Sequence, residues 1–233
     1  KLIFNNLRSP LNMSYEKDTK NAYRNQDKAS AYRNQYIEGF KWARFTMWRQ
    51  KKIIKTLIQY CSFKEADSIL DVPCGAGYIG DLLSELDSEV IASDISMEMM
   101  DLAIDEYESN SFSGFIQSDI TKLPFNPEYF KCTIVLALMH RLPEEIREAV
   151  LNEVMRVTSK YLIVSYSIES TLQKVKKFLL KSFSSNYLPA PSSLSFDSIT
   201  KEFEDSNLNI IRHKRIMPFL SAKVVFLLEI NKH

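Results

Sequence analysis

Four residues within ten positions have the types and spacing to hold a nucleotide-like ligand. Asp71 ends a short apolar run, and Gly75, Gly77 and Gly80 then open a segment whose apolar residues recur at helical spacing. Such glycines allow a sharp turn and leave room for a ligand against the N-terminus of a helix. This strand, turn and helix predict binding of either a dinucleotide or S-adenosylmethionine.

The acid before the turn helps to choose between these ligands. Residues 75–80 match the dinucleotide pattern G-x-G-x-x-G, which is a weak signal by itself. Dinucleotide folds usually begin close to this strand, whereas about sixty residues precede it here. The carboxylate of Asp71 would repel a pyrophosphate and attract the ammonium group of a methionine moiety. The pattern favours S-adenosylmethionine, with a nicotinamide-dependent oxidoreductase as the alternative.

An acid followed by a glycine-rich turn resembles the first motif of the class I S-adenosylmethionine-dependent methyltransferases. The resemblance is strong over residues 65–165 and weaker in the flanks. It implies that S-adenosylmethionine is the cofactor and that Asp71, Pro73, Gly75 and Gly77 contact it. The family often has glycine where this chain has Pro73, and this departure keeps a non-catalytic binding module as a further alternative.

Two later acids extend the resemblance. Residues 89–94 read as a second strand ending at Asp94, about twenty residues beyond the turn, where a carboxylate can accept hydrogen bonds from ribose hydroxyls. A third strand is predicted at residues 115–120. The resemblance implies that Asp119 accepts from the adenine amino group and that Ile120 packs on the ring. The other residues that it assigns to the cofactor are Ile95 and Leu136.

The remaining elements must place these residues at one edge of a sheet. Further strands are predicted at residues 130–138, 161–166, 209–217 and 223–229, with helices opening at Leu142 and Asp197. With the resemblance, this order predicts an α/β, Rossmann-like fold. Its seven-stranded sheet is mostly parallel, with helices on both faces, an antiparallel C-terminal strand pair and a helical N-terminal cap.

The expected organisation is a cap over residues 1–60 and a methyltransferase domain over residues 61–233. The domain is expected to carry an insertion on the substrate side, at about residues 169–196. Residues 31–60 read as one or two helices, and four of their apolar side chains should face the sheet: Ile54, Leu57, Ile58 and Cys61. Aromatic side chains earlier in the cap either pack within it or line a substrate pocket, and this includes Tyr32 and Tyr36.

Charge is unevenly distributed along the chain. Residues 1–64 contain 14 Lys and Arg against 4 Asp and Glu, residues 65–156 contain 5 against 19, and residues 157–233 contain 11 against 6. The basic flanks either dock on the acidic core or cover the acceptor site and favour an anionic acceptor. In the second interpretation, Arg44 and Arg141 are candidate substrate ligands.

The distribution of charge also indicates whether the chain binds a membrane or a nucleic acid. The lysines of residues 174–181 are expected on a solvated helix face, with contact to a membrane surface as the alternative. Nucleic acid is disfavoured, since no compact basic run with interleaved aromatics stands out beyond residues 48–55. The sequence contains no run long enough for a membrane span and no metal-binding pattern. Three cysteines without paired spacing predict reduced, mostly buried thiols in a cytoplasmic protein.

Catalysis of methyl transfer consists largely of holding the acceptor atom in line with the donor. His140 follows the fourth predicted strand, at the edge where ligands bind in open α/β sheets. It is the candidate general base for a hydroxyl acceptor, and a structural histidine is the alternative. The function predicted from the sequence is methyl transfer from S-adenosylmethionine to a small-molecule or saccharide acceptor.

Overall fold

The computed structural model of the protein describes residues 41–107, 112–168, 194–217 and 222–231. Residues 1–40, which include Tyr32 and Tyr36, lie outside the described residues, as does most of the predicted insertion at about residues 169–196. The division into a cap and a domain therefore stays a prediction.

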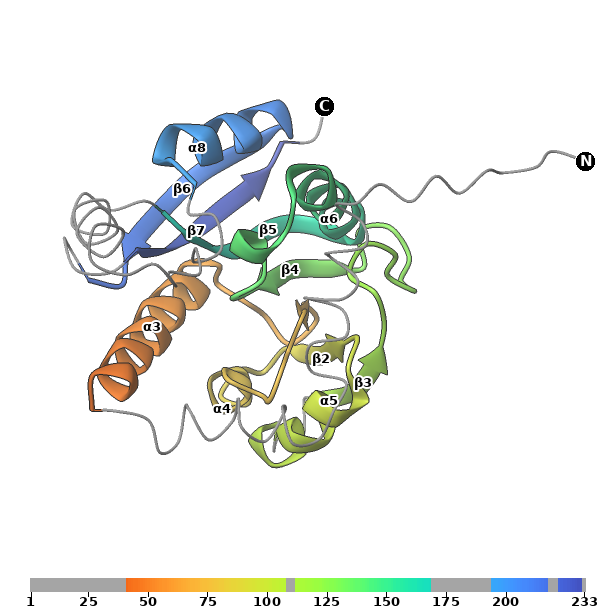
Figure 1. Cartoon of the computed structure of the whole chain (residues 1–233). Helices are drawn as coiled ribbons and strands as arrows, with labels where there is room; N and C mark the ends of the chain where they lie inside the picture. Colours follow the sequence, from red (N-terminus) through yellow and green to blue (C-terminus); the bar gives the residue numbers. More distant parts are fainter. Residues whose placement is uncertain (1–40, 108–111, 169–193, 218–221, 232–233) are drawn as a thin grey trace, which may run out of the picture.

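Seven strands form one sheet in the order β3-β2-β1-β4-β5-β7-β6 (Figure 1). Strands β1 to β5 pair in parallel, whereas β7 is antiparallel to both β5 and β6. This topology confirms the predicted Rossmann-like α/β fold with its antiparallel C-terminal pair. The strands are β1 (Ser68–Asp71), β2 (Glu89–Asp94), β3 (Phe112–Gln117), β4 (Phe130–Val135), β5 (Thr158–Ser167), β6 (Leu208–Arg215) and β7 (Lys223–Ile230).

Helices cover both faces of the sheet. On one face, α3, α4 and α5 pack against the sheet, and on the other face α6 and α8 do so. None of the described helices is both long and apolar enough to cross a bilayer. The helices are α3 (Lys41–Tyr60), α4 (Gly80–Leu83), α5 (Met97–Ala103), α6 (Glu144–Val157) and α8 (Phe196–Asp205), with short 3-10 helices η2 (Ile104–Glu106) and η3 (Met139–Arg141).

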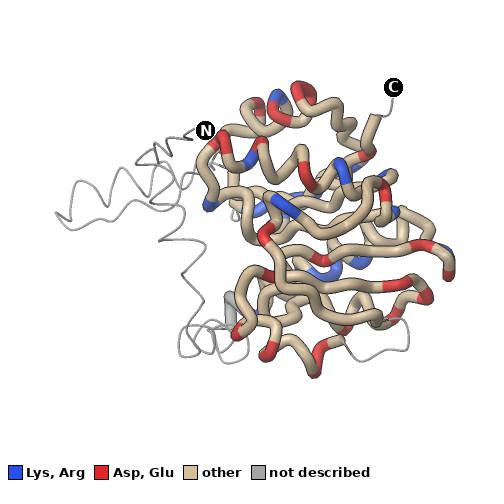
Figure 2. The backbone as a smooth tube through the Cα atoms, turned by 90° about the vertical axis from the view of Figure 1, so that its right-hand side faces the viewer, with Lys and Arg blue, Asp and Glu red and all other residues tan. Residues whose placement is uncertain are grey.

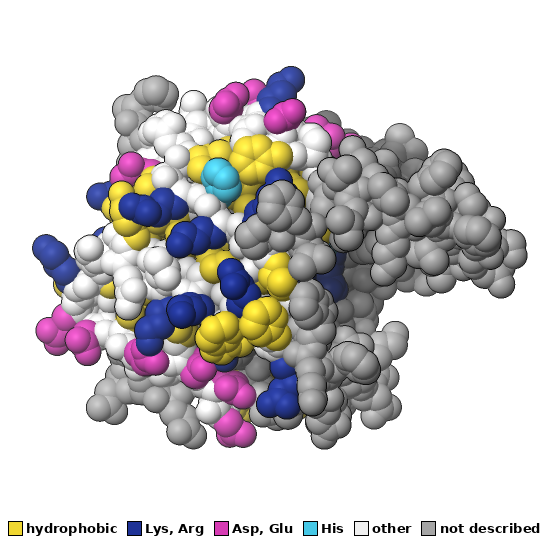
Figure 3. Space-filling model, turned by 90° about the vertical axis from the view of Figure 1, so that its left-hand side faces the viewer, with side chains coloured by type: hydrophobic (Ala, Val, Ile, Leu, Met, Phe, Trp, Pro, Cys, Tyr) yellow, Lys and Arg dark blue, Asp and Glu magenta, His cyan; other side chains and the backbone are white. Residues whose placement is uncertain are grey.

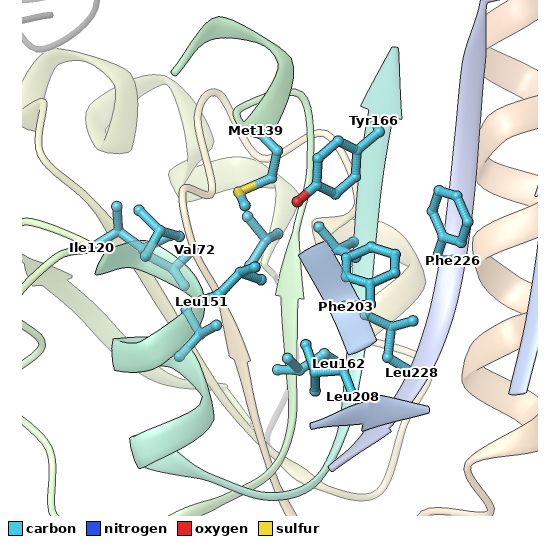
Figure 4. Packing of buried hydrophobic residues seen from close by; sticks show 14 of the residues in the cluster. Val72, Ile120, Met139, Leu151, Leu162, Tyr166, Phe203, Leu208, Phe226 and Leu228 are labelled. Carbon is cyan, nitrogen blue, oxygen red and sulfur yellow. The ribbon is translucent and has the colours of Figure 1, made fainter. Parts of the chain in front are cut away.

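The alternation of side chains along the central strands builds two hydrophobic cores. Leu162 and Val164 of β5 point to the core under α6 and α8, and Ile163 points to the core under α3. Figure 4 shows the first core, where Phe203 of α8 packs near Phe226 of β7. Truncation of such a fully buried side chain to alanine costs about 2–5 kcal/mol, so both cores hold the sheet rigid beneath its carboxyl edge.

The C-terminal half of α3 lies against the sheet as predicted. Ile54, Leu57, Ile58 and Cys61 are all at most 2% exposed and belong to the second core. All three cysteines of the chain are buried and none forms a disulfide. The helix therefore fixes one wall beside the first strand and turn.

Several strand boundaries differ from those predicted, and the differences at β3 and β4 concern the edge of the sheet beside a pocket. β3 runs over Phe112–Gln117 rather than 115–120, and β4 ends at Val135 rather than Leu138. Ala137 has a positive φ of 56°, which is incompatible with continued strand geometry. The consequence is that the residues after both strands belong to loops at the edge of the sheet.

Candidate functional site

A pocket of about 330 Å³ lies at the carboxyl ends of the parallel strands. This volume falls within the range of pockets that bind small ligands. Its wall includes every residue that the sequence assigned to the cofactor: Asp71, Pro73, Gly75, Gly77, Asp94, Ile95, Asp119, Ile120 and Leu136.

The turn after β1 is held by the backbone of the neighbouring strand. The amide of Cys74 donates to the carbonyl of Ser93 over 2.8 Å. Gly75 and Gly77 have φ values of 55° and 76°, which favour glycine. A Cβ on Gly77 would also lie only 2.7 Å from the Cβ of Glu106. Glycine is thus needed there for close approach of η2, a reason that the sequence alone did not reveal.

Asp94 connects the end of β2 to the turn. One carboxylate oxygen accepts from the amide of Gly75 and the other from the amide of Ser96, each over 2.9 Å. Burial raises the pKa of Asp94, and these amide hydrogen bonds oppose that rise. The two hydrogen bonds fix the orientation of this carboxylate, and its role in binding ribose stays a prediction.

Asp71 lies at the bottom of the pocket with 2% of its surface exposed. The hydroxyl of Tyr107 donates to its Oδ2 atom over 2.5 Å. Burial raises the pKa of Asp71 to about 7, with a further contribution from the charge of Asp94, while the Tyr107 hydrogen bond works in the opposite direction. A cationic ligand group would favour the ionised carboxylate.

The loop after β3 forms the third side of the pocket. The amide of Ser118 donates to the backbone carbonyl of Asp94, which ties this loop to β2. Asp119 accepts from the amide and the hydroxyl of Thr121 over 3.0 and 2.8 Å. Ile120 is buried beside it and presents an apolar surface, as binding of an adenine ring requires.

The residues predicted to act on the methyl acceptor do not all lie in the pocket wall. Arg141 lines the pocket, whereas Arg44 is exposed on α3 and His140 lies outside the lining. Burial, followed by the charges of Arg141 and Lys223, lowers the pKa of His140 to about 4, so its imidazole is neutral at pH 7. Its buried Nδ1 atom has no hydrogen-bond partner within the described part of the chain. The role of His140 as a base stays a prediction.

Comparison with known proteins finds similarity to methyltransferases. A family model described as a methyltransferase domain matches residues 69–160. The chain is 26% identical over 150 residues to the ubiquinone/menaquinone biosynthesis C-methyltransferase UbiE of Pseudomonas paraeruginosa, a match that covers 61% of this chain. UbiE of Pseudomonas aeruginosa matches equally well. These matches support a class I S-adenosylmethionine-dependent methyltransferase. The matched region spans about half the length (54%) of these curated relatives.

Solved structures of methyltransferases share the fold of this chain. The magnesium protoporphyrin IX methyltransferase ChlM from Synechocystis PCC 6803, with bound SAH, has a TM-score of 0.77 at 17% identity, covering 92% of this chain and 100% of that one. A methyltransferase in complex with the Trm112 activator of Haloferax volcanii has a TM-score of 0.64 at 16% identity, covering 90% and 98%. These likenesses show the fold, and the ChlM structures were solved with bound SAH and SAM.

The donor set of the pocket fits this cofactor. Three carboxylates stand at the ends of β1, β2 and β3, facing a pocket that also has apolar walls. Asp71 suits an ammonium group, Asp94 suits a pair of hydroxyls, and Asp119 suits an aromatic amine. The fit supports the assignments made from the sequence, which remain proposals for the individual residues.

Several pocket residues of the methyltransferase were missed by sequence reasoning. Gln50 of α3 is one of them, and its only signal is a polar side chain within an otherwise apolar, buried stripe. Lys223 begins β7 and carried no signal, because only the fold brings it to the pocket. The other missed residues include Met47, Lys51, Met99, Glu106, Ser118, Ala137 and Leu138.

Proposed function

We propose that this protein transfers a methyl group from S-adenosylmethionine to a small-molecule acceptor. The main support for this proposal is the extent of the pocket. Its wall includes the three carboxylates after β1, β2 and β3 and also a second region after β4, formed by Ala137, Leu138 and Arg141. The names of the UbiE and ChlM relatives, which refer to small organic compounds, support an acceptor of this class.

In this proposal, some residues bind the cofactor and others position the acceptor. When bound, the cofactor supplies an electrophilic methyl group on a sulfonium. Asp71, Asp94 and Asp119 would hold its ammonium, ribose and adenine groups. The amide of Ala137 donates to the Ser165 hydroxyl over 2.8 Å, which fixes the loop against β5. A rigid loop on the acceptor side can hold the acceptor atom in line, the main requirement of the reaction.

The general base is a separate part of this proposal. His140 adjoins Arg141 in η3 and is neutral at pH 7, so it can accept a proton from a hydroxyl acceptor. An acceptor that arrives as a neutral amine needs no such base. We also propose, as a finer statement, that the acceptor carries a negative charge.

Calorimetry with the purified protein tests the cofactor. S-adenosylmethionine and S-adenosylhomocysteine should bind, whereas NAD and NADP should not, because a carboxylate lies at the base of the pocket where a pyrophosphate would be repelled. A mass-spectrometric screen for a 14 Da increase in candidate acceptors then tests transfer. Binding without turnover on any small acceptor would favour a non-catalytic binding module.

A further inference from the structure

Gln50 is a polar residue on the buried, otherwise apolar face of α3. That face packs on the sheet through Ile53, Ile54, Leu57 and Ile58. Gln50 lies one helical turn before Ile53 and Ile54 on the same side of the helix and is only 5% exposed. Burial of an amide is unfavourable unless its polar atoms form hydrogen bonds. Packing against the sheet therefore does not explain a glutamine at this position.

The side chain of Gln50 is open to the pocket. Within the part of the chain that the structure describes, it forms no side-chain hydrogen bond. Its amide atoms are also not sealed in the core, because the fully buried polar side-chain atoms without a partner among the described residues belong to Ser84 and His140. Gln50 lines the pocket, so the amide keeps its accessible surface on that side. A buried amide that is reached only through a pocket is suited to bind a ligand.

The segment of α3 around Gln50 is fixed beside the glycine turn that follows β1. The hydroxyl of Tyr78 donates to the carbonyl of Met47 over 2.7 Å. Lys51 donates to both carboxylate oxygens of Asp81, over 2.8 and 2.9 Å. Met47 lies one helical turn before Gln50 and Lys51 follows it directly, so contacts to the turn and to α4 flank the amide on both sides. The amide is thus held close to the end of the pocket where β1 ends.

The outer face of α3 has a different chemistry. Trp48 is 57% exposed there, and the Nζ atom of Lys52 lies 5.4 Å from the centre of its ring. Figure 3 shows the Lys and Arg side chains that gather with hydrophobic side chains on this side of the molecule. The charged residues beside Gln50 thus reach solvent or Asp81, whereas the buried position in the pocket wall is occupied by a neutral amide.

The pocket wall around the glycine turn is acidic. The sequence contains no Lys or Arg between residues 65 and 121, and four acids of this segment line the pocket: Asp71, Asp94, Glu106 and Asp119. Figure 2 shows acidic positions along the loops of this part of the molecule. These acids suit the cationic and neutral donors of S-adenosylmethionine, but they repel the carboxylate of its amino-acid end. Because this segment offers the carboxylate no cationic side chain, a donor from a neighbouring element would offset the repulsion.

We propose that the side-chain amide of Gln50 binds the carboxylate at the amino-acid end of S-adenosylmethionine. This inference rests on the proposed function, in which Asp71 holds the ammonium group of the same end. The NH2 group of an amide can donate to a carboxylate oxygen, and such a charge-assisted hydrogen bond is stronger than one between neutral groups. A lysine at this position would be attracted to the acids of the pocket, whereas a neutral amide leaves them available to the ligand.

Calorimetry with two ligands tests the role of Gln50. The ligands are S-adenosylhomocysteine and its decarboxylated analogue, which keeps the ammonium group and lacks the carboxylate. Gln50→Met removes the amide at similar length, and Gln50→Glu keeps the shape and adds a negative charge. The matched control is Gln59→Met, which changes an exposed glutamine of the same helix outside the pocket wall. Thermal unfolding of each variant shows that it is folded.

The native protein should bind S-adenosylhomocysteine more tightly than the analogue. Gln50→Met should weaken S-adenosylhomocysteine about tenfold or more and leave the analogue within about threefold, because only the first ligand loses a hydrogen bond to a charged group. Gln50→Glu should weaken S-adenosylhomocysteine further through repulsion and bind the analogue at least as tightly as the native protein does. Gln59→Met should leave the affinities for both ligands unchanged.

Two results would overturn the role of Gln50. Unchanged affinity of Gln50→Met for S-adenosylhomocysteine would assign the carboxylate to another donor of the wall, such as Arg141 or Lys223. An equal loss of both ligands would show that the amide does not distinguish the carboxylate. The ratio of the two affinities within one variant is independent of the folded fraction, so Gln50→Glu decides the question if Gln50→Met is unstable. Failure of S-adenosylhomocysteine to bind the native protein would refute the proposed function itself.

Discussion

Replacement of Tyr107 by phenylalanine should weaken cofactor binding in a pH-dependent way. The change removes the hydroxyl that donates to Asp71, while the ring stays stacked on Phe112 with 4.9 Å between centroids. The other ionisable groups that act on Asp71 and Tyr107 are Asp94 and Cys74. The variant therefore alters the charge state of Asp71 with little change in packing.

The size of the effect follows from the hydrogen bond that is lost. A hydrogen bond to a charged group contributes about 1.5–3 kcal/mol, which corresponds to roughly 1–2 pKa units. The pKa of Asp71, about 7 in the native protein, should rise by that amount in the variant. At pH 7 the ionised fraction then falls from about one half to roughly 1–10%, so the apparent affinity for an ammonium-bearing ligand falls about 5–50-fold.

Calorimetric titration with S-adenosylhomocysteine between pH 6 and pH 8.5 measures this effect. In the native protein the affinity should rise as pH increases through about 7, because the carboxylate ionises. In the variant the same rise should occur at higher pH. As controls, 5′-methylthioadenosine lacks the amino-acid end, and Tyr161→Phe changes another buried tyrosine outside the pocket. Identical pH profiles in both proteins, or an equal loss with 5′-methylthioadenosine, would refute the reasoning.

Three further substitutions test other parts of the site. Asp94→Ala removes the acceptor for two backbone amides, so S-adenosylmethionine affinity should fall tenfold or more, and unchanged affinity in calorimetry would remove Asp94 from the site. Gly77→Ala should destabilise the fold by about 1–3 kcal/mol in urea unfolding, more than Gly114→Ala, which is strained but has open space. His140→Ala should lower kcat about 100-fold with unchanged cofactor affinity, whereas a lower Tm with normal kcat would indicate a structural histidine.

That Asp71, Asp94 and Asp119 lie in one pocket could be predicted because the strands that carry them follow one another along the chain. Each parallel strand from β1 to β3 ends near an acid, and the carboxyl ends of parallel strands meet at one edge of the sheet. Strand type and order were therefore sufficient to bring Asp71, Asp94 and Asp119 together. The error at β3 did not matter, since Asp119 lies at the same edge whether it ends the strand or follows it.

Contacts that depend on tertiary packing could not be predicted in this way. Nothing in the sequence around Tyr107 indicates a contact with Asp71, because only the turn at η2 directs its hydroxyl to that carboxylate. The clash that a side chain on Gly77 would have with Glu106 likewise depends on how closely η2 approaches the turn. Both contacts join residues about thirty positions apart, for which sequence periodicity gives no distance.

The reversal of strand direction at the C-terminus explains why Lys223 was harder to find than the acids of the pocket wall. A parallel strand delivers its last residue to the carboxyl edge, whereas antiparallel β7 delivers its first residue, Lys223, to that edge. A search for chemistry at strand ends therefore finds Asp94 and misses Lys223. The same reversal allows a basic C-terminal segment to complete a pocket whose other half is acidic. The order and direction of the strands therefore decide which charged residues reach the wall of the pocket.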